Sequence, residues 1–175
     1  MQVTLGLAAP VFHGRVQPEL DTLLTAAKGA GFTVPIGTNY YERPIALSFL
    51  LTTSNQAATR QVQLQLLDPF GVVVAAEPVA STQTASLAYT YSFLAQLATP
   101  SAVASLVVIS PLFDFVIPSD YELSVGIVNV QTNDQVSAIR YYRDRFSTGP
   151  DGYPIGGVDL DPYESEVAAE RALVK

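Results

Sequence analysis

Gln61-Val62-Gln63-Leu64-Gln65-Leu66 places apolar residues at every second position, and this alternation decides the fold class. Successive side chains of a strand point to opposite faces, so one face of this segment is expected to be buried and the other to meet water. The same period of two recurs in residues 86–93 and 121–130. No long helical pattern separates these segments, and the sequence therefore predicts an all-β protein.

Turn residues divide the middle of the chain into short pieces. Strand-like composition continues in five more segments, residues 45–52, 72–76, 106–109, 113–117 and 136–146. Asp68-Pro69-Phe70-Gly71 is typical of a tight hairpin, and further turns are marked by Pro118-Ser119-Asp120 and Thr132-Asn133-Asp134. About eight short strands with such turns are typical of a sandwich. We predict an antiparallel, jelly-roll-like β-sandwich domain over residues 44–146.

The predicted N-terminal arm covers residues 1–43 and contains one candidate helix. Pro18 suits the first position of a helix and Gly29 the position after its last residue, which predicts a short helix over residues 18–28. The apolar residues of this segment follow helical spacing, and they are Leu20, Leu23, Leu24 and Ala27. Such a stripe is expected to lie against a partner.

The predicted C-terminal tail covers residues 147–175 and begins with alternating Gly and Pro residues. Asp161 as N-cap and Pro162 as first helical residue predict a second short helix. Acidic side chains concentrate here, and they are Asp151, Asp159, Asp161, Glu164 and Glu166. Their spacing does not match a twelve-residue calcium loop, so helix capping and solvation are expected rather than a metal site.

Charge is scarce in the middle of the chain. Residues 44–139 contain one basic residue, Arg60, and six acidic residues, against thirty Ser, Thr, Asn and Gln. Charged residues make up 14% of the whole chain, whereas a typical domain has about a quarter. A surface of this kind suits permanent contact with other proteins.

Composition also excludes several classes of partner and site. The absence of cysteine removes disulfides and cysteine-based zinc sites. A formal net charge of −7 opposes nucleic acid, whose binding depends on Lys and Arg. No run of about 18 apolar residues is present to span a membrane, and the first twenty residues lack the pattern of a secretory signal.

No catalytic pattern is present. His13 is the sole histidine, and a general base needs a nucleophile or an orienting carboxylate within hydrogen-bond reach, so a surface or packing role is expected. The chain has no Gly-x-Ser-x-Gly, phosphate-loop or dinucleotide fingerprint. We expect a protein that is not an enzyme and that uses no cofactor or metal.

Arginines alternate with tyrosines near the end of the predicted sandwich, in residues 140–146. Strand alternation puts Tyr141, Arg143 and Arg145 on one face, and it puts Arg140, Tyr142, Asp144 and Phe146 on the other. Arginine favours planar pairs with carboxylates, so salt bridges within the chain or with a neighbouring protein are expected.

Three stretches carry a family resemblance: residues 52–62 (TTSNQAATRQV), 67–73 (LDPFGVV) and 129–140 (NVQTNDQVSAIR). Together they resemble a recurrent group of tailed-bacteriophage virion proteins, and the third is the most specific. The resemblance covers about residues 44–146. It implies a β-sandwich subunit on the capsid surface of the virion, a decoration or cement protein that binds across subunits of the major capsid protein.

Extended arms on a stiff body would bind such a shell through many weak contacts repeated by symmetry. The expected partners are the major capsid protein, other virion proteins, or further copies of this chain as a trimer. The expected contact residues are Leu20, Leu23, Leu24, Tyr40 and Tyr41 in the amino-terminal part, Tyr153, Ile155, Tyr163 and Val167 in the tail, and Arg140, Arg143 and Arg145 as polar contacts.

Two alternatives stay open at this point. The first is another virion position, such as a head-to-tail, collar or tail-associated subunit, which would have the same composition. The second is a carbohydrate-binding module of a host-recognition apparatus. Such modules present aromatic platforms, and without Trp the platform would have to come from Tyr40, Tyr41, Tyr141 and Tyr142.

Overall fold

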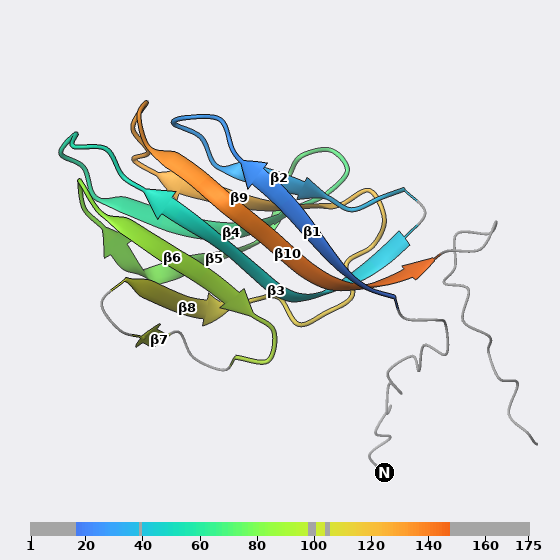
Figure 1. Ribbon diagram of the computed structural model, residues 1–175. Coiled ribbons are helices and arrows are strands. Elements are labelled where there is room, and N and C mark those ends of the chain that lie inside the picture. The colour runs from blue at the N-terminus through green and yellow to red at the C-terminus, as the bar shows by residue number, and fades with distance from the viewer. Residues whose placement is uncertain (1–16, 39, 98–100, 104–105, 148–175) are drawn as a thin grey trace, which may run out of the picture.

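The computed structural model describes residues 17–38, 40–97, 101–103 and 106–147, which form ten strands and no helix (Figure 1). The larger sheet contains, in spatial order, β1 (Gln17–Thr25), β10 (Gln135–Ser147), β3 (Tyr40–Thr52), β6 (Ala88–Leu94), β8 (Val107–Pro111) and β7 (Ser101–Val103). The smaller sheet contains β2 (Phe32–Pro35), β9 (Glu122–Val128), β4 (Arg60–Leu67) and β5 (Val73–Gln83). Strand pairs within the sheets are antiparallel, except for the parallel pair of β6 and β8.

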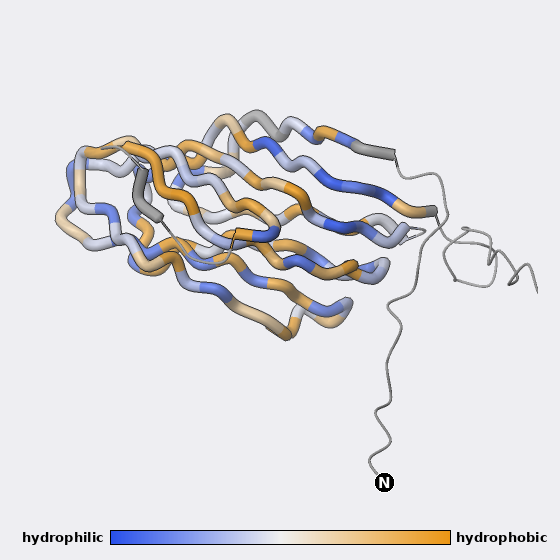
Figure 2. The backbone as a smooth tube through the Cα atoms, turned by 90° about the horizontal axis from the view of Figure 1, so that it is seen from below, coloured by the Kyte–Doolittle hydropathy of each residue, from blue (hydrophilic) through white to orange (hydrophobic). Residues whose placement is uncertain are grey.

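The core lies between the two sheets and is built by alternation. Leu47, Phe49 and Leu51 of β3 are buried, as are Val62 and Leu64 of β4 from the opposite sheet. Figure 2 shows the resulting change between hydrophobic and hydrophilic residues along the strands. The prediction of an all-β protein with two mostly antiparallel sheets is confirmed, while its jelly-roll-like detail stays a prediction.

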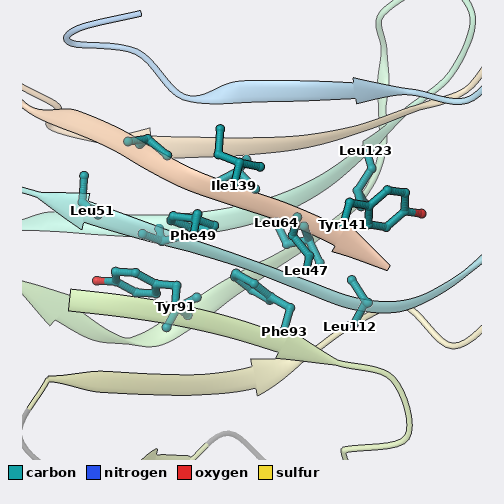
Figure 3. Close-up of a cluster of buried hydrophobic side chains, with 14 of the residues drawn as sticks. Leu47, Phe49, Leu51, Leu64, Tyr91, Phe93, Leu112, Leu123, Ile139 and Tyr141 are labelled. Carbon is teal, nitrogen blue, oxygen red and sulfur yellow. The ribbon is translucent and has the colours of Figure 1, made fainter. Parts of the chain in front are cut away.

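Phe49 lies in the middle of an aromatic group inside the core (Figure 3). Its ring stacks on Tyr91 of β6 with centroids 5.3 Å apart, and Phe93 lies 6.1 Å away. Phe32 of β2 meets the Phe49 ring edge-on at 5.2 Å. The contact with Phe32 comes from the smaller sheet, so Phe49 joins the two layers directly.

The predicted helix over residues 18–28 is wrong, because residues 17–25 form strand β1. Leu20 stands opposite Tyr142 of β10 in an antiparallel register. Gly29 does not follow a helix but lies in the turn between β1 and β2, with φ of 67° and an N–H that donates to the Asp134 carbonyl at 2.9 Å. A Cβ on Gly29 would lie 2.9 Å from the Cα of Thr132, so this position requires glycine for space as well as for conformation.

The other predicted strands and helix also differ in part from the structure. Residues 113–117 do not form a strand, and only Ile117 pairs, in an isolated bridge with Glu42. Strands β2 and β7 were not predicted. Strands β1 and β2 fall within the predicted arm, and each lies at the edge of one sheet. The predicted helix that begins near Asp161 lies outside the described residues.

Candidate partner-binding surface

Two arginines of β10 form an ion-pair cluster with carboxylates from both neighbouring strands. Arg143 contacts Glu42 of β3 at 3.1 Å and Asp21 of β1 at 2.6 Å. Arg145 contacts the same Glu42 at 3.1 Å and Glu19 of β1 at 2.7 Å. Because these strands are adjacent, residues at alternate positions bring their charged groups to one side of the sheet. The cluster therefore joins the edge strand β1 to the interior of the larger sheet.

The members of this cluster differ in how far their side chains are exposed to solvent. The side chain of Glu42 is 0% exposed and that of Arg143 is 3% exposed, whereas Asp21 is 43% exposed. Burial raises the pKa of Glu42, and the positive charges of Arg143 and Arg145 oppose that rise without cancelling it. Arg145 also lies over the ring of Tyr40 at 4.6 Å, a cation–π contact.

Removing the two carboxylates of β1 should loosen that strand without unfolding the protein. In Glu19→Gln/Asp21→Asn, the partly exposed ion pairs to Arg143 and Arg145 are lost, and such pairs contribute about 1 kcal/mol or less each. We expect faster amide hydrogen exchange in β1, with exchange in β3 and β6 unchanged. Equal exchange of β1 in both proteins would contradict a holding role for the cluster.

The predicted contact residues fall into four groups. Leu20, Tyr40 and Arg140 are exposed, Tyr40 with Arg145 over its ring and Arg140 without an ion pair among the described residues. Arg143 and Arg145 are engaged within the chain, which agrees with the expected salt bridges to its own carboxylates. Tyr41 is half-buried. The remaining residues are not placed: the side chains of Leu23 and Leu24, and all of Tyr153, Ile155, Tyr163 and Val167, lie outside the description. Contact with a partner stays a prediction for all of them.

Arg60, the sole basic residue between positions 44 and 139, is completely buried. Its Nε lies 2.8 Å from a carboxylate oxygen of Asp134, which precedes β10 and is also completely buried. The guanidinium further donates to two carbonyl oxygens of the β3–β4 loop, those of Gln56 at 3.0 Å and Ala58 at 2.7 Å. This segment of the chain therefore exposes no positive charge.

Asp134 is surrounded by donors besides Arg60. Its carboxylate accepts from the Ser54 N–H at 2.7 Å, the Ser54 hydroxyl at 2.9 Å and the Gln131 N–H at 2.8 Å. Burial alone would raise the pKa of Asp134, but hydrogen bonds from Arg60, Gln131 and Ser54 outweigh burial and hold the pKa well below its usual range. The Arg60–Asp134 cluster joins the first and third stretches of the phage resemblance, so those motif residues have a structural role.

An apolar band crosses the outer face of the larger sheet. The strand registers place five residues in one row across five adjacent strands, namely Leu20, Tyr142, Ala46, Leu94 and Pro111. Leu20 is 60% exposed, Tyr142 39% and Leu94 38%. At about 4.8 Å per strand spacing the row is roughly 19 Å long. Strand alternation predicts Tyr142 on the face opposite Tyr141 and Arg143, and the structure agrees, because Tyr141 and Arg143 are buried and Tyr142 is exposed. Phe146, predicted on the same face as Tyr142, is buried.

The β4–β5 hairpin presents a second apolar surface. Phe70 is 89% exposed at its tip, and the next large side chains along the chain, Val72, Val73 and Val74, are exposed as well. The sequence predicted this turn but assigned it no function. The signal was the run Phe70-Gly71-Val72-Val73-Val74, which has no polar residue to cover it.

Sites for other chemistry are sparse in the described part of the chain. Its residues include no group of three or more His, Cys, Asp or Glu side chains that could hold a metal ion. A shallow hollow of ≈ 220 Å³ lies at one end of the larger sheet, lined by Arg43, Pro44, Ile45, Ala95, Gln96 and Asp144. Within the described residues, no helix is long and apolar enough to cross a membrane.

No family model and no curated protein matches this sequence. Among solved structures, the chain is similar to chains from infectious bursal disease virus. A chain of the crystal structure of the T13 viral particle is 13% identical, with 88% of this chain and 36% of that chain covered and a TM-score of 0.38. A chain of the VP2 subviral particle is 12% identical, with 98% and 53% covered and a TM-score of 0.30. This chain thus spans between 36% and 53% of the length of those viral chains.

Proposed function

We propose that this chain is a non-enzymatic structural protein of a virus particle, and more specifically a decoration or cement protein. It binds across subunits of the major capsid protein of a tailed bacteriophage and stabilises the head. The resemblance of residues 44–146 to tailed-bacteriophage virion proteins is the reason for proposing a phage particle. The surface of the described sandwich is the reason for proposing a structural role.

The observation that carries this proposal is the apolar band. Soluble monomers seldom expose large contiguous apolar surfaces, and such surfaces commonly mark protein contacts. Here Leu20 and Tyr142 are exposed on adjacent strands, and Leu94 is exposed in the same row beyond the half-buried Ala46. A row one residue wide and about 19 Å long offers much less area than the roughly 800 Å² per partner of a stable pairwise complex. Repetition of such a contact over a symmetric shell compensates for its weakness.

The buried polar groups support a role without catalysis. Arg60 and Asp134 neutralise each other inside the fold, and Arg143 neutralises Glu42. Their perturbed environments therefore have a structural explanation, and none of these four side chains opens onto a cleft with a nucleophile.

The carbohydrate-binding alternative loses part of its aromatic platform. Tyr141 is completely buried, and its neighbour Tyr142 lies on the outer face of the sheet. Tyr40 is engaged with Arg145. A platform needs several rings on one open surface, and these tyrosines do not provide it. A neck, collar or tail position differs from the head position in copy number alone.

Quantitative mass spectrometry of washed, nuclease-treated particles tests the proposal. We expect the chain to be present at a fixed ratio to the major capsid protein, and that ratio to remain the same after purification in high salt. A small copy number that matches the tail or neck proteins would favour the alternative position in the virion. Absence from washed particles would contradict a structural role altogether.

A further inference from the structure

The hairpin between β4 and β5 holds the backbone of Phe70 in an ordered turn. The Asp68 carboxylate accepts hydrogen bonds from the N–H groups of Phe70 and Val72, both at 2.9 Å. Backbone bonds from Gly71 N–H to Asp68 O and from Asp68 N–H to Val72 O, also at 2.9 Å, close the same turn. Gly71 supplies the positive φ of 78° that the turn requires. A large aromatic side chain is thus presented to solvent by an ordered backbone, which reduces the entropy lost on binding.

The base of this hairpin belongs to a small core cluster at one end of the sandwich. Leu66 before the turn and Ala75 after it pack with Ile36 and Ile117. Ile117 pairs with Glu42 near the beginning of β3, so this small cluster lies at the end of the sandwich where β3 begins. Phe113 packs against this cluster, and Phe115, 44% exposed, contacts Phe113 with ring centroids 5.6 Å apart. Tyr40 is the first residue of β3, two positions before Glu42. Phe70, Phe115 and Tyr40 therefore lie at the same end of the sandwich, which we call the docking end.

The described chain also begins and ends here. Gln17 of β1 stands opposite Arg145, and Ser147 at the end of β10 stands opposite Tyr40 (Figure 1). The sixteen residues before Gln17 and the twenty-eight after Ser147 are therefore attached to the docking end. They include Tyr153 and Tyr163, which the sequence predicts as contact residues.

Charge decides the kind of partner. Residues 61–139 contain no Lys or Arg, and Asp68, Glu77 and Glu122 lie on the strands and turn near the hairpin. The arginines at this end, Arg43 and Arg145, are paired with carboxylates of the chain, so an anionic membrane surface is not favoured. Residues 148–175 hold six carboxylates and two basic residues, attached to the docking end. Two copies joined end to end would bring these acidic segments together, which disfavours a second copy as the partner. An apolar pocket on a different protein, without surrounding acidic groups, is favoured by both observations.

We propose that the docking end is a second surface, besides the apolar band, by which this protein attaches to a shell protein of the particle, with Phe70 inserted into an apolar pocket of that partner. The inference rests on the proposed function and adds this anchor contact to it. Buried aromatic anchors dominate the binding energy of many interfaces, and preorganised anchors do so at the lowest entropic loss.

The test is rebinding of purified protein to particles produced from a genome that lacks this gene, measured by co-sedimentation. Phe70→Ser should bind on the order of tenfold or more weakly, since loss of an anchor residue has at least this effect. Phe70→Leu, which keeps an apolar side chain, should bind with an affinity between those of the wild type and Phe70→Ser. Val128→Ser is the matched control, because Val128 is 41% exposed at the far end of β9 and should bind like the wild type.

A separate variant tests presentation of the ring. Asp68→Ala keeps Phe70 and removes the acceptor that orders the turn, so dissociation should become faster while the ring itself is intact. Unfolding midpoints should be unchanged in Phe70→Ser, because the replaced side chain is almost entirely solvent-exposed. That result separates a binding defect from a folding defect.

The outcomes distinguish this inference from the proposed function. Wild-type protein that fails to bind the particles overturns the proposed function and this inference with it. Wild-type binding that Phe70→Ser and Asp68→Ala retain in full overturns the docking end alone. Phe70-dependent binding to anionic vesicles, or a Phe70-dependent dimer in sedimentation equilibrium, overturns the assignment to a shell protein. A photo-cross-linker at position 70 that joins another virion protein in intact particles supports it.

Discussion

Replacing Arg60 by methionine is expected to lower the free energy of unfolding by about 3–5 kcal/mol, because a buried carboxylate loses its counter-charge. The side chains of Arg60 and Asp134 are both 0% exposed, so water cannot compensate. Asp134→Leu should have a comparable effect, since it leaves the guanidinium with only backbone carbonyls and one hydroxyl. Chemical denaturation of the purified protein measures both effects.

The double variant Arg60→Met/Asp134→Leu is the control for this ion pair. Replacement of both partners by apolar residues removes the unpaired charge, so its destabilisation should be clearly smaller than the sum of the single effects. Additive effects would show that the two side chains act independently, although Arg60 donates to both carboxylate oxygens of Asp134, from Nε at 2.8 Å and from Nη2 at 2.9 Å.

The same pair predicts a direction of pH dependence. The pKa of Asp134 is lower in the folded than in the unfolded state, so its contribution is complete above about pH 4 and is lost as the pH falls toward the folded value. The stability difference between wild type and Asp134→Asn should therefore shrink below about pH 4. A difference that grows with acidity would have the wrong sign.

Phe49→Ala should destabilise the protein by about 3–5 kcal/mol, the usual range for removal of a fully buried aromatic ring. The Phe49 side chain is 1% exposed and contacts rings from both sheets, those of Tyr91 and Phe32. A sheet on either side limits collapse around the cavity, which places the effect toward the upper end.

Val128→Ala is the matched control for this core substitution. Val128 is 41% exposed, so its truncation should change stability by about 0.5 kcal/mol or less. Equal effects in the two variants, compared by denaturant unfolding, would contradict a shared core centred on Phe49.

Alternation predicted the strands whose two faces differ, and it could not predict the edge strand β1. Segments such as residues 61–66 have a buried and a wet face, so a period of two is visible in their sequence. In β1 the inward positions Glu19 and Asp21 are charged, and their alternation has meaning only beside Arg143 and Arg145 of β10. Leucines at helical spacing therefore gave the wrong prediction, because pairing with a strand more than a hundred residues away overrides local preference.

The candidate surface was predictable only in part, because its contacts also depend on strands that are distant in sequence. The sequence predicts salt bridges of Arg143 within the chain or with a neighbouring protein, and the structure shows that it is paired within the chain. Which carboxylate an arginine meets depends on strand order, which one sequence does not contain. Phe70 was visible as part of a turn, but its exposure depends on how the two sheets close beneath the hairpin. The isolation of Arg60 in a long stretch without other basic residues was a usable sign of burial.

The position of β10 has a consequence for biosynthesis. This strand is made after the other nine, yet it lies between β1 and β3 inside the larger sheet. On the ribosome, β1 and β3 therefore wait with unsatisfied backbone groups until Ser147 has emerged, and a chain dominated by such distant pairings closes slowly. We expect nascent chains that end before Ser147 to associate with chaperones. The last step in forming the larger sheet should be the insertion of β10 between β1 and β3.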